Sequence, residues 1–134
     1  MATDLKVSDA VANAQADLVG AQCNNGYLRV YGGIKPATAD DAAPPTALAT
    51  LRFAAEAFRP AVNRQIQSNP IAPDMNTEGT GEATWFRAFK ADGVTPVFDG
   101  TVGTANANIN LSPSAMVHNG GEFHIGSITY RVSN

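Results

Sequence analysis

Residues 83–103, ATWFRAFKADGVTPVFDGTVG, decide the fold class of this chain. Two strand-like runs, 83–89 and 94–102, flank the segment Lys90-Ala91-Asp92-Gly93. An Asp-Gly pair between two such runs is a strong signal for a β-hairpin. Trp85, Phe86 and Phe89 place aromatic side chains on both faces of the first strand, which is typical of a strand that packs on two sides. The stretch therefore predicts an antiparallel hairpin whose first strand is central in a sheet.

Shorter strand patterns lie on both sides of this hairpin. Tyr27–Tyr31 alternates cleanly with a period of two, and residues 47–53 place three apolar side chains on one face. The remaining candidates are one short strand near Ile66, one at Ile109 and Leu111, and one along residues 123–132 with a bulge at Gly126. Seven or eight short strands at this spacing predict an all-β fold, an antiparallel β-sandwich or jelly roll.

A helical pattern precedes the strands, over residues 5–24. Ser8 is placed to cap its start, and Asn24-Asn25-Gly26 suits the left-handed turn that often ends a helix. Four apolar residues share one face at helical spacing, namely Val7, Val11, Ala14 and Leu18. This face is thin because alanine dominates the segment, so we expect the helix to lean on a larger body. The predicted architecture is a single domain over 1–134, with an arm and helix at 1–26 and the β-sandwich at 27–134.

Composition narrows the class of protein. The chain has 134 residues, 44% of them hydrophobic and 16% charged, which suffices for one core. A formal net charge of −3 is unlike the basic footprint of a nucleic-acid binder, so we expect no direct nucleic-acid contact. The single cysteine excludes an internal disulfide and a cysteine-based zinc site. No apolar run approaches the ~20 residues of a membrane span, and the first residues lack signal-peptide features. We expect a protein made in the cytoplasm of its host cell, with no membrane partner.

Each candidate for catalysis has a plainer interpretation. His118 and His124, the two histidines, do not have the spacing of a helical zinc motif. A metal site with three ligands would need a carboxylate such as Glu122 beside the two histidines. We favour the interpretation that one histidine lies in a turn and the other in a strand. Cys23 needs a nearby base to act as a nucleophile. Because Cys23 lies at the end of the predicted helix, we expect a buried, inert thiol.

The remaining candidates are equally weak. Three carboxylates lie near one another in a loop, but any chain with twelve acids offers such groups by chance; they are Asp74, Glu78 and Glu82. The segment Gly100-Thr-Val-Gly103-Thr lacks the Lys of a phosphate-binding loop and reads as a strand. The strip from Trp85 to Lys90 is able to stack on bases or sugars, although a packed central strand is the favoured interpretation. We predict no catalytic, cofactor-binding or metal-binding residue, no cofactor, and a protein that is not an enzyme.

Several motifs resemble a family of small structural proteins from the virions of tailed bacteriophages. They are DLKVSDAVANAQADLV at 4–19, YGGIKPATADDA at 31–42, GEATWFRAFKADGVTPVFDGTVGT at 81–104, ANANINL at 105–111, and the Gly-Gly-x-Phe-x-Ile-x-Ser-Ile-Thr-Tyr segment at 120–130. The similarity covers nearly the whole chain. Its most specific part is 83–103, where the similarity lies in the order and the lengths of the two sequence blocks and the turn between them.

The resemblance implies a capsid decoration or cement protein. Such a protein binds the outer surface of the icosahedral head, where it contacts the major capsid protein and stabilises the shell against the pressure of packed DNA. Self-association as a homodimer or homotrimer is expected, because virion sites lie on local symmetry axes. The contacts are expected in the arm and helix from Met1 to Leu18, with residues 1–6 as an arm that orders on docking, and in loops 32–46 and 60–80.

Two other functions remain open from the sequence. The first is a tail- or baseplate-associated protein that binds a receptor or carbohydrate, for which Trp85, Phe86 and Phe89 provide the aromatic side chains. Exposure of Trp85 in a groove would favour it, and burial would remove its best residue. The second is a small jelly-roll hydrolase or lyase, which requires His118, His124 and an acid to converge on a metal ion.

Overall fold

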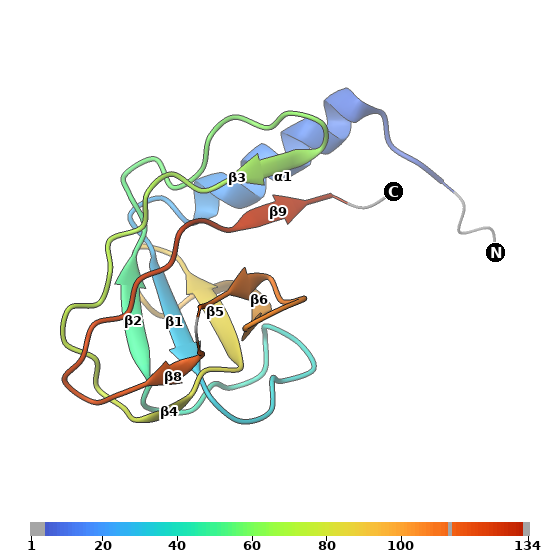
Figure 1. Cartoon of the computed structure of the whole chain (residues 1–134). Coiled ribbons are helices and arrows are strands. Elements are labelled where there is room, and N and C mark those ends of the chain that lie inside the picture. The colour runs from blue at the N-terminus through green and yellow to red at the C-terminus, as the bar shows by residue number, and fades with distance from the viewer. Residues whose placement is uncertain (1–4, 113, 133–134) are drawn as a thin grey trace.

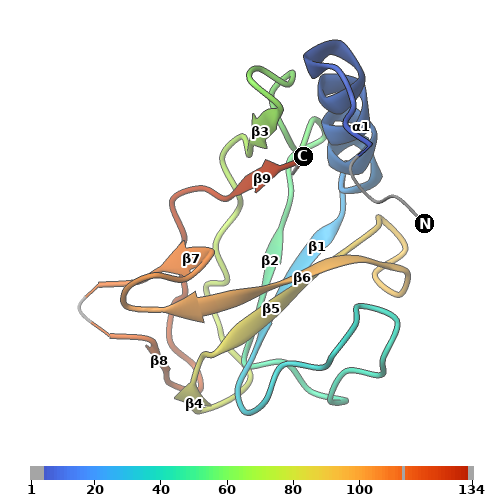
Figure 2. The same cartoon turned by 90° about the vertical axis from the view of Figure 1, so that its right-hand side faces the viewer.

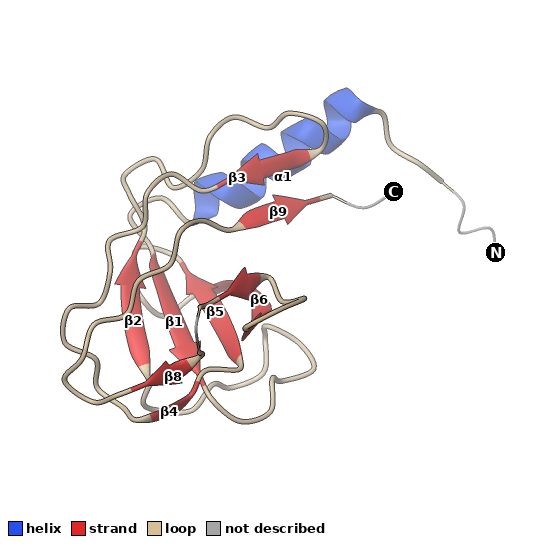
Figure 3. Cartoon of the chain, in the orientation of Figure 1, coloured by secondary structure: helices blue, strands red, loops and turns tan. Residues whose placement is uncertain are grey.

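The computed structural model describes residues 5–112 and 114–132. Within these ranges the chain forms one helix, α1 (Asp9–Gln22), and nine strands that long loops connect (Figures 1 and 3). The strands are β1 (Tyr27–Tyr31), β2 (Ala49–Arg52), β3 (Gln65–Gln67), β4 (Gly81–Glu82), β5 (Trp85–Phe89), β6 (Pro96–Gly103), β7 (Ile109–Asn110), β8 (Met116–Val117) and β9 (Thr129–Arg131). The prediction of a mostly β fold with an N-terminal helix is confirmed.

Five strands form the main sheet, in the order β2-β1-β5-β6-β7. The predicted hairpin is confirmed, since β5 and β6 pair antiparallel with Arg87 opposite Asp99, and β5 is the middle strand. The expectation of a wholly antiparallel sheet is wrong at β7, which pairs parallel to β6. A short connection over 104–108 suffices there because the parallel pairing spans two residues of each strand.

The main sheet has two differently packed faces. One face carries the larger core, with Leu28, Phe86 and Val102 buried under the rest of the chain. On the other face Tyr31 and Trp85 form a second buried cluster with Ala47. Alternate side chains of β5 therefore enter two cores, and all five of its residues are buried. This confirms the interpretation of the aromatic strip as a packed central strand.

Two short ribbons accompany the main sheet, β3 with β9 and β4 with β8. The first crosses the larger core, where the rings of Phe98 and Tyr130 stack with centroids 5.7 Å apart. Ribbons of two strands are not a second sheet equal to the first, so a sandwich or jelly roll is not confirmed. The long C-terminal strand expected over 123–132 is replaced by β9 and an isolated bridge between Phe123 and Asp74.

The helix packs on its small residues instead of its large ones. Ser8 caps α1 by accepting a hydrogen bond from the Val11 backbone N–H at 3.2 Å, as expected. The residues that face the core are Ala12, Ala16 and Gly20. A Cβ on Gly20 would lie 2.9 Å from Ile66 Cδ1 and 3.1 Å from Phe58 Cβ, so the backbone approaches these side chains closely. Within the described residues no helix is long and apolar enough to span a membrane.

Candidate functional site

The residues weighed for catalysis occupy structural positions. His124 Nε2 lies 3.0 Å from Glu122 Oε1 in an exposed pair. The carbonyl of His118 accepts hydrogen bonds from the Thr77 hydroxyl and from the Gly121 N–H, which fixes a turn. Over residues 5–112 and 114–132, no three His, Cys, Asp or Glu side chains gather as they would around a metal ion. His118 therefore belongs to a turn, and His124 belongs to an exposed pair with Glu122.

The thiol of Cys23 is fully buried at the C-terminal end of α1. Burial raises its pKa to about 12, because the thiolate would lose its hydration. A thiol in this state is a poor nucleophile at neutral pH. Its environment agrees with the inert thiol inferred from the sequence.

The loop carboxylates and the glycine-rich segment also have structural contacts. Asp74 accepts hydrogen bonds from the backbone N–H groups of Thr50 and Asn76, at 2.8 and 3.0 Å, and thereby ties its loop to β2. Glu78 and Glu82 are exposed. A Cβ at Gly100 would lie 2.4 Å from the ring of Phe86, so this glycine permits close packing within β6.

The aromatic strip is buried by the loop that follows β1. Trp85 is 1% exposed and its ring stacks on Tyr31 with centroids 4.5 Å apart. The indole N–H donates to the carbonyl of Gly32 at 3.1 Å. Burial removes Trp85 from any surface that contacts a sugar or receptor. The side chains of this face hold a loop in place.

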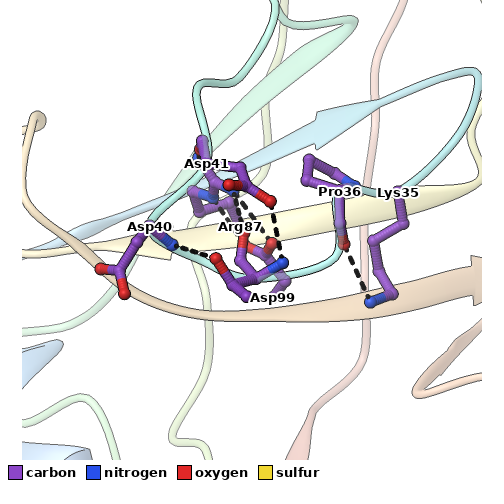
Figure 4. A network of polar contacts seen from close by, with 7 residues as sticks. Lys35, Pro36, Asp40, Asp41, Arg87 and Asp99 are labelled. Atoms are coloured by element: carbon purple, nitrogen blue, oxygen red, sulfur yellow. Dashed lines mark hydrogen bonds and ion pairs between the residues drawn. The ribbon is translucent and has the colours of Figure 1, made fainter.

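Arg87 anchors the 32–46 loop on the face of the main sheet that carries Tyr31 and Trp85 (Figure 4). Its Nε and Nη2 bind the two carboxylate oxygens of Asp99 at 2.6 and 3.0 Å. Its Nη1 donates to the carbonyl of Asp41 at 2.7 Å, and Nη2 donates to the carbonyl of Thr38 at 3.3 Å. The hydrogen bond with Asp99 raises the pKa of Arg87 further, so the cation is permanent.

Sequence reasoning treated Arg87 as part of an aromatic strip and missed this anchor. A signal was present: an Asp-Gly hairpin brings residues of its two strands into cross-strand pairs, and Arg87 and Asp99 are such a pair. The bulge between Ala88 and Phe89 shifts the register by one residue, so the pair does not follow from a simple count.

The outer side of α1 is the clearest unpartnered surface among the described residues. We call Val11 and Leu18 the outer row, and their exposed fractions are 48% and 64%. The predicted face comprised Val7, Val11, Ala14 and Leu18, but Val7 precedes the helix, and the other three are exposed instead of packed on the body. Small residues on the opposite side allow a closer approach to the core.

The outer row ends at an open pocket of about 310 Å³. Leu18 and Val19 of α1 line one wall, and Lys90, Pro96 and Val97 of the β5–β6 hairpin line the other. The surface therefore continues from the helix onto the rigid main sheet. An apolar surface of this kind is typical of a contact with another macromolecule.

The regions predicted to contact a capsid lie at two ends of the molecule. α1 packs against β3 at one end, and the 32–46 loop lies at the other (Figures 1 and 2). The predicted contact loop 60–80 belongs to neither end alone, because it runs from β3 beside the helix to β4 at the opposite end. Met1–Asp4, which belong to the predicted arm, lie outside the described residues. Of the rest, Leu5 and Ile34 are almost fully exposed, one at each end.

Comparison of the chain with protein-family models, with curated protein sequences and with solved structures gave no significant match.

Proposed function

We propose that this protein is a decoration or cement protein of a tailed-bacteriophage virion, located on the outer surface of the head. The sequence motifs that resemble such proteins support the proposal, and so does the outer row of α1. A helix of a monomeric domain normally turns its large apolar side chains to the core. Here they face outward on a helix that is already packed, which is the arrangement expected of a surface reserved for a partner.

The mechanism follows from many weak contacts acting together. Each copy binds where neighbouring capsid subunits meet and buries apolar area across the seam. The contacts of many copies on one shell add up, so modest affinity per copy gives large stabilisation of the shell. The loop anchor at Arg87 and the doubly packed β5 keep the body rigid, which limits the entropy lost on docking. No chemical step is part of this function, and the protein acts without a cofactor.

The proposal includes a two-layered arrangement related to a β-sandwich. The main sheet forms one layer, and the β3–β9 ribbon packs against its larger core. It also includes self-association, because decoration sites on a shell lie on symmetry axes.

The direct test is cryo-electron microscopy and quantitative mass spectrometry of virions from the phage that encodes the chain. Hundreds of copies with icosahedral symmetry on the head are expected. A handful of copies at the tail would favour the alternative, a tail- or baseplate-associated protein that binds a receptor or carbohydrate. Absence from purified virions would overturn both.

A binding experiment tests the outer row itself. Leu18→Gln and Val11→Gln are added to expanded capsids that lack the protein, and bound copies are counted after sedimentation. We expect each variant to bind at least tenfold more weakly than the unchanged protein. Ala10→Gln is the control, because Ala10 is exposed on α1 but lies away from the row. Equal binding of all three variants would contradict the assignment of the surface.

A further inference from the structure

The guanidinium of Arg64 is buried and only partly hydrogen-bonded. Its side chain is 10% exposed and lies at the N-terminal end of α1, at the side of the helix where β3 packs (Figure 1). Nη1 donates to the Asp9 carboxylate at 2.8 Å and to the Val7 carbonyl at 3.3 Å. Nε and Nη2 are buried and have no hydrogen-bond partner in the described part of the chain. Such donors are rare in native proteins, because they lose their hydrogen bonds to water and gain none in return.

Arg87 shows what the same edge of a guanidinium binds elsewhere in this molecule. Its Nε and Nη2 donate to the two carboxylate oxygens of Asp99 at 2.6 and 3.0 Å. This edge of arginine carries two parallel N–H groups, whose spacing matches two oxygens of one carboxylate or phosphate. The acceptor that would complete Arg64 therefore has a defined chemistry, that of an oxyanion which offers two adjacent oxygens.

The charges of the described residues around Arg64 favour an anion. Asp9 is the acid in contact with the guanidinium, but its side chain is 81% exposed, so water screens much of its charge. Asp17, the next acid along α1, lies two helical turns farther on. Two further cations lie near: Lys6 precedes the helix, and Arg131 of β9 pairs across the ribbon with the residue that follows Arg64. The N-terminal end of α1 adds a partial positive charge.

Access to Nε and Nη2 requires a local movement, because both atoms are buried. The segment 5–8 beside Arg64 is held weakly. None of its four residues belongs to a helix or strand, and all four are exposed. One hydrogen bond of 3.3 Å joins its Val7 carbonyl to the guanidinium. Exposed segments with few contacts open at a low cost in free energy, so we expect this segment to move when a ligand binds.

We propose that Arg64 forms an oxyanion-binding site at the N-terminal end of α1, with Nε and Nη2 as a two-point donor pair. The ligand is a carboxylate or phosphate group, supplied by a free phosphate ion or by an acidic side chain of a partner. The backbone N–H of Arg64 donates to Asn13 Oδ1 at 2.8 Å, so a ligand held here also fastens α1 to the turn before β3. The site is separate from the outer row and does not depend on binding to a capsid.

The turn that carries Arg64 supplies matched variants. Asn63 and Arg64 have φ values of 53° and 68°, in the left-handed region that favours glycine. Arg64→Gly removes the guanidinium and leaves a residue suited to this backbone. Asn63→Gly makes the equivalent backbone change one position earlier and keeps the guanidinium. The Asn63 side chain is exposed, so its loss leaves the site intact.

The first experiment measures the melting temperature of the full chain and of both variants. The probes are inorganic phosphate and N-acetylglutamate amide, each compared with chloride at the same ionic strength. For the wild type and Asn63→Gly we expect a rise of about 3 °C at roughly ten times the dissociation constant, and for Arg64→Gly no rise. A response to phosphate alone identifies a phosphate ligand, and a response to the blocked glutamate identifies an acidic side chain. No rise in the wild type with either probe, or an equal rise in all three proteins, would overturn the proposal.

The second experiment separates two-point binding from simple attraction of charge. Arg64→Lys keeps the positive charge but loses the paired N–H groups, so its dissociation constant for the probe should rise about tenfold. Titration calorimetry measures this constant, and it decides the question even if Arg64→Gly does not fold. Binding as tight as that of the wild type would overturn the two-point site. Neither experiment involves a capsid, so the capsid proposal is tested separately.

Discussion

Arg87 on β5 and Asp99 on β6 lie directly opposite each other and form a two-point ion pair that is almost completely buried. The pair does more than join two strands, because the same guanidinium holds two carbonyls of the 32–46 loop. Trp85 lies beside it, with the Arg87 guanidinium carbon 5.4 Å from its ring centroid. One buried cation thus links the middle of the sheet to its longest surface loop.

Removal of this cation is expected to destabilise the protein strongly. Arg87→Met leaves the buried carboxylate of Asp99 without a partner, and losses of about 3–5 kcal/mol are typical of such a change. Urea denaturation measures the loss. The double variant Arg87→Met/Asp99→Leu should recover part of it, because no charge is left buried. A double variant less stable than Arg87→Met would contradict this account.

The close contact between Gly100 and Phe86 predicts a second large effect. Gly100→Ala places a Cβ within 2.4 Å of the Phe86 ring, and both groups are buried. We expect a loss of about 1–3 kcal/mol from overpacking. Gly126→Ala is the control, since a Cβ there meets nothing within 4 Å. Thermal unfolding of the two variants should separate them clearly; equal melting temperatures would show that β6 tolerates the added methyl.

Cys23 is expected to resist thiol reagents in the folded protein. Its pKa of about 12 keeps the side chain protonated at pH 8, and burial denies the reagent access. Titration with a disulfide reagent should label no thiol in the native state and one thiol per chain in denaturant. Rapid labelling without denaturant would indicate that α1 separates readily from the core.

The turn at Asp92 predicts a pH dependence of stability. Its carboxylate accepts hydrogen bonds from the Thr95 hydroxyl and from the N–H groups of Thr95 and Val94, and these lower its pKa from 3.8 to about 2. A lowered pKa in the folded state means that the stabilisation is present above pH 4 and is lost as the pH falls towards 2.

Asp92→Asn removes the charge and retains an acceptor oxygen. Melting temperatures measured from pH 5 to pH 2 should therefore fall less steeply for the variant than for the wild type. Parallel curves would mean that the carboxylate contributes no proton-linked stability to the turn.

The outer row predicts small effects on folding. Val11→Gln and Leu18→Gln should each change the free energy of unfolding by no more than about 0.5 kcal/mol, as is usual for exposed positions. Chemical denaturation gives this value directly. A loss of 2 kcal/mol or more would show that the row packs against the body of the same chain.

The sequence predicts elements well where one local pattern carries the information. The Asp-Gly turn and its flanking runs specify the β5–β6 hairpin, and Ser8 specifies the start of α1. The short strand near Ile66 is also confirmed as β3. In each case neighbouring residues determine the outcome.

Predictions that depend on distant contacts succeed less often. The packing face of α1 depends on how closely Phe58 and Ile66 approach Gly20, and periodicity in large side chains does not report this distance. Beside the parallel pair of β6 and β7, Asn108 Oδ1 accepts the Thr101 N–H at 2.9 Å, and a strand pattern in the sequence does not report such a side-chain contact. To predict the contact between Arg87 and the 32–46 loop, one needs the cross-strand register of Arg87 and Asp99, which a bulge alters.

The way in which Arg87 holds the 32–46 loop has an evolutionary consequence. The loop groups that bind the guanidinium are backbone carbonyls, which every residue type possesses. Substitutions at the solvent-facing positions of this loop therefore leave the clamp intact. The 32–46 loop is therefore free to change in charge and shape during evolution, while the sheet beneath it stays constant.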